Sequence, residues 1–294
     1  MVNLTWILKL SLWGDASVLE NNWCGSRSKA MKSILSVVAQ NPHSGMLSYT
    51  DAEVRHRNQN NAVIDFVDFW KKGHGTAPKM LIFDSRFTTY ENLDRLNKDE
   101  IMFLTLRRRG KNLLTHTHKI PKEQWQIISI ERAKGKKCNL RIHDHFTTLR
   151  GYHGEVREII ITDNNRLKPA FLITNDAESN VEMLVKKYAQ RWLVEQEISE
   201  QVAFFQLNNP SPSIVVKVDF DLTLSLLAHN LYRILANALP GFEKCTAETI
   251  YRRFLANGAQ IQIKNNHVII RFKKKTHLPI LLNVPWINRT TSLS

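Results

Sequence analysis

Two short apolar runs in this chain are followed at once by an aspartate. Residues 5–13 lead through Gly14 into Asp15, and residues 80–83 lead directly into Asp84. Apolar, β-prone runs of this length are typical of buried strands. In α/β sheets, ligand-binding groups gather beyond the carboxyl ends of strands. If the two strands are neighbours, the carboxylates of Asp15 and Asp84 face one another.

Signals for strands and helices alternate along the rest of the chain. Strands are expected at residues 34–39, 45–49, 101–106, 157–161 and 170–174, and a turn at residues 41–45. Helices are expected at residues 62–72, 89–97, 177–205 and 220–238, and a hairpin at residues 260–272. Asn175 is the expected N-cap of the long helix, with Glu178 completing a capping box. Asp219 and Asp221 are expected at the start of the next helix, where carboxylates suit the dipole. An opening three-strand meander followed by mixed strands and helices predicts an α/β fold with a mixed sheet.

The segment 101–168 differs from its surroundings in the pattern of its apolar, polar and basic residues. It alternates apolar and polar residues, and basic turns at residues 107–111 and 132–137 separate its strands. We expect a β-rich basic insertion that forms a small sheet beside the core. The predicted division is a first part of the core at 1–100, the insertion at 101–168, a second part of the core at 169–240, and a C-terminal tail at 241–294.

The formal net charge of +14 points to a polyanionic partner. Nucleic acid and an anionic membrane surface both fit such a charge. No run of 18 apolar residues is present, so no transmembrane helix is expected, and the first residues do not read as a signal peptide. Three widely separated cysteines do not make a disulfide framework, which favours a reducing cytoplasm.

A third carboxylate, Glu195, lies within the expected long helix. Tyr188, Arg191 and Glu195 follow the spacing i, i+3 and i+7, which places them on one helix face. Taken alone, such a stripe is more typical of an ordinary ion pair than of a catalytic site.

Three motifs resemble bacterial insertion-sequence transposases of the DDE type. Residues 188–195 have the pattern Y-x-x-R-x-x-x-E and follow a strand that ends in Thr174 and Asn175. Residues 81–87 are similar to the second-aspartate motif of this family, and residues 13–17 to the first. The resemblance covers about residues 4–240, and the motif around Glu195 is its most specific part.

The resemblance implies a fold, a reaction and a set of partners. The fold is an RNase H-like, retroviral-integrase-like core interrupted by a β-rich insertion. Asp15, Asp84 and Glu195 would hold two Mg²⁺ ions, with Mn²⁺ as a substitute, and Asp15 would bridge them. The reaction is cleavage and strand transfer of double-stranded transposon-end DNA by a homodimer on paired ends. The protein would act in the bacterial cytoplasm, at the nucleoid and away from membranes.

Several residues are candidates for DNA contact. Arg191 suits a bidentate hold on a phosphate. Tyr188 suits a phosphate contact or the positioning of Glu195, and Trp192 suits either a displaced base or the interior. The remaining candidates are basic residues near the second aspartate and in the first basic turn: Arg86, Arg107, Arg108, Arg109 and Lys111.

Some features leave alternatives open. Val202 stands where the family often has a lysine, and because Asp15 lies so near residue 1 we expect no N-terminal DNA-recognition domain in this sequence. The alternative functions are a nuclease without strand transfer and a catalytically inactive DNA-binding remnant. Asp51, which follows another strand-like segment, is the alternative first carboxylate.

Overall fold

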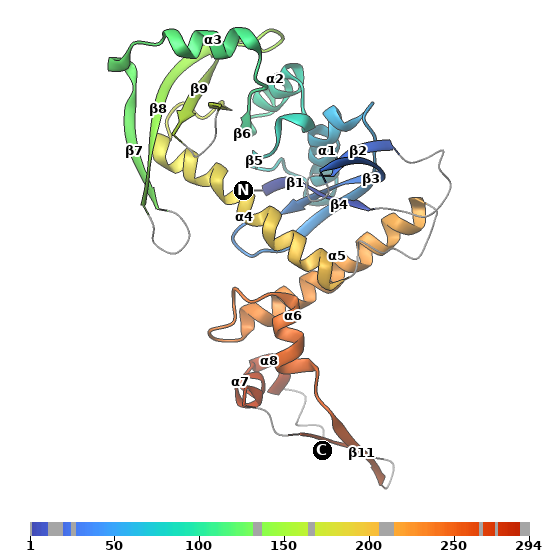
Figure 1. Cartoon of the computed structure of the whole chain (residues 1–294). Coiled ribbons are helices and arrows are strands. Elements are labelled where there is room, and N and C mark those ends of the chain that lie inside the picture. Colours follow the sequence, from blue (N-terminus) through green and yellow to red (C-terminus); the bar gives the residue numbers. More distant parts are fainter. Residues whose placement is uncertain are drawn as a thin grey trace.

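A ten-stranded mixed sheet forms the centre of the molecule (Figure 1). The computed structural model describes residues 2–10, 20–24, 28–131, 137–163, 168–205, 215–264, 267–273 and 276–288. The first half of the sheet contains β1 (Val2–Leu10), β2 (Glu20–Cys24), β3 (Lys29–Gln40), β4 (Leu47–Val54), β5 (Met80–Ile82) and β6 (Met102–Leu106). The second half contains β7 (Gln126–Glu131), β8 (Lys137–Thr148), β9 (Glu155–Thr162) and β10 (Ala170–Thr174).

Helices connect and cover these strands. The helices that precede the tail are α1 (Ala62–His74), α2 (Tyr90–Lys98), α3 (Lys111–Lys119), α4 (Val181–Phe204) and α5 (Val215–Ala238). The tail holds α6 (Ala247–Ile250), the hairpin β11 (Ala259–Lys264) and β12 (His267–Phe272), α7 (Leu278–Leu282) and α8 (Pro285–Asn288). Within the described residues, no helix is both long enough and apolar enough to cross a membrane.

The first half of the sheet has an antiparallel part and a parallel part. Strands β4, β3 and β1 form an antiparallel meander, and β5 and then β6 continue from β1 in parallel. Helix α1 connects β4 to β5, and α2 connects β5 to β6. The predicted α/β class with a mixed sheet and an opening meander is therefore confirmed.

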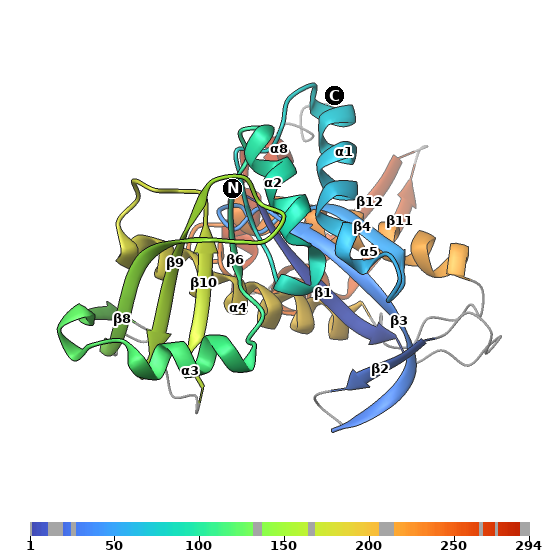
Figure 2. The ribbon, with the colours of Figure 1, turned by 90° about the horizontal axis from the view of Figure 1, so that it is seen from above.

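The predicted insertion is built differently from the expectation. The segment 101–168 holds β6, which is a central strand of the sheet, and β7, β8 and β9. Strand β10, which was predicted as a core strand, pairs with β6, and β9, β8 and β7 follow in that order, each antiparallel to its neighbour, so that they lengthen the central sheet. Figure 2 shows β10, β9 and β8 beside β6. The expected separate sheet was wrong, because β6 has a free edge that β10 can pair with directly. Residues 111–119 also form a helix, α3, that the alternation pattern did not indicate.

Two apolar cores fill the two faces of the sheet. Helices α1 and α2 cover one face, where Leu81, Phe103 and Ile173 are buried with Phe66 and Leu93. Helix α4 covers the other face, where Leu184 and Val185 join a second set of buried strand residues, which includes Ile82, Leu104 and Leu172. Because side chains alternate along a strand, the central strands feed both cores at once.

Helix α4 begins four residues later than predicted. Asn180 caps it, since its Oδ1 accepts a hydrogen bond from Glu182 N at 2.7 Å. The predicted cap, Asn175, faces the sheet instead and accepts from Phe103 N at 2.9 Å while donating to Ile101 O at 3.1 Å. A side-chain amide can pair with both groups of a strand backbone, and this competes with helix capping.

Helix α5 closes the edge of the sheet at β4. The Asn230 side chain accepts from Leu47 N and donates to Leu47 O, both at 2.8 Å. Asp219 accepts from Ala52 N at 3.2 Å, so its carboxylate binds the sheet edge and does not lie at the helix start as predicted. These contacts pair backbone groups that an edge strand would otherwise leave open to another chain.

The amide of Asn230 can be tested as an edge clamp. We expect Asn230→Ala to lower the free energy of unfolding by about 1–3 kcal/mol, because two backbone groups of Leu47 lose their partner. Chemical denaturation of Asn230→Ala beside Asn112→Ala, at an exposed site in α3, measures this difference. Equal stability of the two variants would contradict the clamp.

Candidate functional site

Asp84 lies at the carboxyl end of a central strand. It follows β5 and the fully buried Phe83, and it is half-buried. Its Oδ1 accepts a hydrogen bond from Arg86 N at 3.0 Å and thereby caps a short 3-10 turn, Ser85–Phe87. Within the described chain, no hydrogen bond or ion pair engages its second carboxylate oxygen. This oxygen is a suitable ligand for a hard cation such as Mg²⁺.

Helix α4 carries the Tyr-x-x-Arg-x-x-x-Glu motif across the sheet. It packs along β1 and β6 on the face opposite to α1 and α2. Tyr188 and Arg191 are buried, and the Arg191 guanidinium carbon lies 5.2 Å from the centre of the Tyr188 ring. These two side chains therefore lie between helix and sheet. Glu195 follows Arg191 by four residues in the same helix.

Several predicted site residues lie outside what the structure describes. Asp15 falls in the segment 11–19, and the side chains of Trp192, Glu195 and Val202 fall outside the described part of α4. Among the described side chains, no three His, Cys, Asp or Glu residues come together as a metal site. Two of the three predicted ligands are not in that set, so the convergence of Asp15, Asp84 and Glu195 stays a prediction.

The alternative first carboxylate, Asp51, lies inside β4 on the meander. Its Oδ1 accepts from Glu53 N at 2.7 Å, and its Oδ2 lies 3.5 Å from the Tyr49 hydroxyl. Burial, followed by the negative charges of Asp51 and Asp65, raises the pKa of Tyr49 above its ordinary range. Asp51 thus has local partners near the β4 edge.

The basic residues after β6 have different environments. Arg107 is mostly buried, whereas Arg108, Arg109 and Lys111 are exposed, as is Arg86. The Arg108 Nη2 donates to Asn60 Oδ1 at 3.1 Å and to the carbonyl oxygen of Ser85 at 3.2 Å. Arg108 therefore bridges two loops next to Asp84.

A buried ion pair uses one of the arginines predicted to contact DNA. Glu158 of β9 is 1% exposed, and Arg107 Nη1 lies 2.9 Å from its Oε2. His145 Nε2 lies 3.4 Å from the other oxygen. Burial would raise the pKa of Glu158, but the hydrogen bonds and charges of His145 and Arg107 outweigh it and hold that pKa below its usual value. The sequence pattern did not single out this cluster, although Glu158 directly precedes the apolar run of Ile159, Ile160 and Ile161.

Arg157, the neighbour of Glu158, braces the approach to α4. Its guanidinium forms a bidentate pair with Asp144, at 3.0 and 2.8 Å. Its Nη1 also donates to three carbonyl oxygens between β10 and α4, those of Asp176, Ala177 and Ser179. This guanidinium ties the insertion to the loop that leads into the motif-bearing helix.

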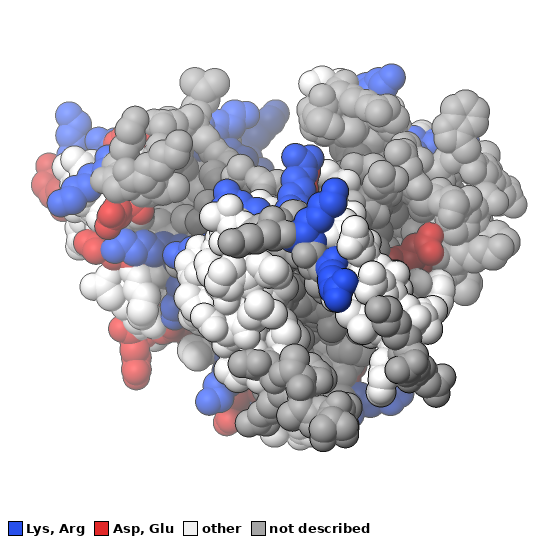
Figure 3. All heavy atoms as spheres, turned by 90° about the horizontal axis from the view of Figure 1, so that it is seen from below, with Lys and Arg blue, Asp and Glu red and all other residues white. Residues whose placement is uncertain are grey.

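Charged side chains are unevenly spread over the end of the molecule that bears the tail. In that view, one group of Lys and Arg side chains lies near the centre, and other Lys and Arg side chains lie among the acidic ones towards the rim (Figure 3).

No protein-family model matches this sequence, and no curated protein matches it. The likeness to a transposase family accordingly depends on the three sequence motifs, of which residues 13–17 lie outside the described part of the chain.

The buried carboxylate of Glu158 yields a pH-dependent prediction. A lowered pKa means that Glu158 stabilises the fold above its unfolded pKa, about 4.5, and that this contribution is lost as the pH falls through the folded pKa. We expect Glu158→Gln to reduce stability at neutral pH by roughly 1.5–3 kcal/mol, because Arg107 loses its anion.

The measurement is denaturation at several pH values, with Glu155→Gln at the exposed start of β9 as the control. The gap between Glu158→Gln and the wild type should narrow below pH 4.5. A gap that stays constant with pH would contradict the ion-pair interpretation.

Proposed function

We propose that this chain is a metal-dependent DNA transposase that cuts and joins DNA ends through Asp15, Asp84 and Glu195. The observation that carries the proposal is a juxtaposition. Asp84 ends a strand that lies between β1 and β6, and the helix with the Tyr188, Arg191 and Glu195 motif packs along those two flanking strands. The second-aspartate motif thus lies in the sheet, and the Tyr188–Glu195 motif lies in the helix that packs on that sheet, although the two motifs are far apart in the sequence.

The topology supports an RNase H-like core for this proposal. An antiparallel meander, two further strands parallel to β1, and helices α1 and α2 on one face are compatible with that fold. The four strands β7–β10 enter between Asp84 and Glu195, which is where the resemblance implies an insertion. Helix α4 follows the last of these strands, β10, after residues 175–180.

The three proposed carboxylates are ligands that suit hard divalent cations such as Mg²⁺. Asp84 offers a carboxylate at a strand end, and Mg²⁺ prefers carboxylate and water oxygens. When bound, two such ions activate a water or 3′-hydroxyl and stabilise the leaving oxygen of an in-line displacement. Asp15, Asp84 and Glu195 would hold them. The Arg86 backbone N–H fixes the orientation of the Asp84 carboxylate, and the Arg191 guanidinium lies over the Tyr188 ring in the turn of α4 that precedes Glu195.

The partner proposed for this site is duplex DNA. The net charge of +14 supports it, as do the exposed Arg86 and Arg108 beside Asp84 and the exposed Arg109 and Lys111 next along the chain. Arg107 is assigned a structural role, since its guanidinium neutralises the buried Glu158. Pairing of two copies on paired DNA ends remains part of the proposal.

Removal of a single carboxylate tests the reaction. We expect Asp84→Asn and Glu195→Gln each to reduce Mg²⁺-dependent cleavage and joining by about a hundredfold or more, because a neutral amide is a poor Mg²⁺ ligand. DNA affinity and thermal stability should stay near those of the wild type. Asp68→Asn, at an exposed position of α1, is the matched control. Full activity in either carboxylate variant would refute the proposed metal site.

The exposed part of the basic turn tests the DNA path. We expect Arg109→Gln combined with Lys111→Gln to weaken binding to all duplexes about equally, since phosphate contacts carry little sequence information. The slope of log affinity against log salt should flatten by roughly 0.9 for each phosphate that the substituted side chains no longer neutralise. Arg57→Gln with Lys72→Gln, both exposed and outside this turn, is the control. An unchanged slope would move the DNA path away from this turn.

A further inference from the structure

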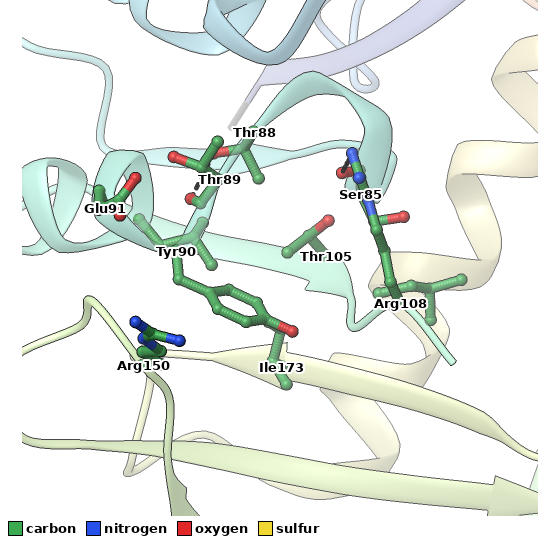
Figure 4. Close-up of a pocket in the computed structure, with 11 residues that line it drawn as sticks. Ser85, Thr88, Thr89, Tyr90, Glu91, Thr105, Arg108, Arg150 and Ile173 are labelled. Atoms are coloured by element: carbon green, nitrogen blue, oxygen red, sulfur yellow. Dashed lines mark hydrogen bonds between the residues drawn. The ribbon is translucent and has the colours of Figure 1, made fainter. Parts of the chain in front are cut away.

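A small hollow lies beside Asp84, between the end of β5, the start of α2 and the turn after β8 (Figure 4). Its polar lining consists mainly of hydroxyl and guanidinium groups, from Ser85, Thr88, Thr89, Thr105, Arg108 and Arg150. The hydrophobic contributions come from Leu93, Leu106 and Ile173, and the Tyr90 ring forms part of the wall.

One lining group is a buried hydroxyl that lacks a partner. Thr105 is 1% exposed, and no atom of the described structure forms a hydrogen bond with its Oγ1. The hydroxyl lies on the β6 face that looks towards α2, and Figure 4 shows it directed into the hollow. A buried polar group without a partner destabilises the fold, so it calls for an explanation.

Apart from Glu91, the other polar side chains of the lining are guanidinium groups or hydroxyls that can donate hydrogen bonds. Arg108 and Arg150 lie on opposite sides of the hollow (Figure 4). The amino-terminal end of α2, with its N-cap Thr89, opens onto the same space and contributes the positive end of the helix dipole. Glu91 is the single acidic group among the lining residues, and two guanidinium groups outweigh it.

The two sides of the hollow are held firmly together. Asp94 of α2 accepts hydrogen bonds from both the backbone N and the Nδ1 of His153, at 2.8 and 2.9 Å. Gly151, with φ +89°, comes so near to α2 that an added Cβ would lie 3.1 Å from the Glu91 side chain. The turn bearing Arg150 is thereby fixed against α2, although 59 residues separate Asp94 from His153.

We propose that this hollow binds a phosphate group of the DNA backbone next to the reacting strand, with Thr105, Arg108 and Arg150 as its ligands. The inference rests on the proposed function only for the source of the phosphate. A tetrahedral oxyanion accepts hydrogen bonds from hydroxyls and guanidinium groups together, and arginine suits it through its fork of donors. The Thr105 hydroxyl gains the partner that it lacks in the protein alone.

The first test uses inorganic phosphate and no metal, so that it does not depend on cleavage. Binding is followed by NMR titration of the full chain at constant ionic strength. We expect Arg108→Gln to weaken phosphate binding about tenfold and Thr105→Val several-fold. Thr105→Val should keep or raise the thermal stability, because a methyl group replaces an unpartnered hydroxyl.

Two control variants separate the hollow from general effects. Thr117→Val removes a similarly buried hydroxyl that already donates to Leu113 O in α3, and Arg57→Gln removes an exposed charge elsewhere. Neither should change phosphate affinity. Equal phosphate affinity in the wild type, Thr105→Val and Arg108→Gln would overturn the site.

The second test distinguishes the DNA backbone from a free phosphate as the source. Duplexes with a single neutral methylphosphonate at successive positions are bound by the wild type and by Arg108→Gln. We expect one position at which the substitution weakens the wild type but not the variant. Phosphate binding without such a position would overturn the DNA source. If both tests confirm the phosphate site but Asp84→Asn cleaves DNA as fast as the wild type, the phosphate site is supported and the proposed reaction is refuted.

Discussion

Burial of both faces of the central strands is the constraint on which the rest of the structure depends. Along β5 and β6, neighbouring side chains enter opposite cores, as with Leu81 and Ile82 or Phe103 and Leu104. Such strands have no solvent face on which to carry a charged group. Polar chemistry is thereby moved to the strand ends, and Asp84 takes this place directly after the buried Phe83.

The backbone groups at the edges of the sheet also need partners. On one side, β6 continues into four antiparallel strands, so that the insertion becomes part of the sheet. On the other side, β4 is covered by α5, whose Asn230 and Asp219 bind its outward backbone groups. Antiparallel addition and side-chain pairing are two solutions to the same problem, the unpaired edge.

The basic side chains of this protein occupy two kinds of environment. Arg107 and Arg157 are drawn inward by Glu158 and Asp144, where they join the insertion to the sheet and brace the loop before α4. Arg109 and Lys111, a few residues along the chain from Arg107, remain exposed. The net charge alone does not distinguish these groups, because the assignment depends on which acids the fold brings near.

The sequence by itself determined the α/β class, the opening meander, most strand and helix positions, and the place of Asp84 after a buried strand. These follow from local periodicity and from apolar runs that end in a polar residue. The start of α4, the pairing of the insertion with β6, the Arg107–Glu158 pair and the hollow around Thr105 were decided only by tertiary structure. Each joins residues that are distant in the chain, such as Asn175 with Phe103 or Asp94 with His153. Local patterns do not encode such pairings, because an amide, a carboxylate or a hydroxyl takes the partner that packing brings within reach.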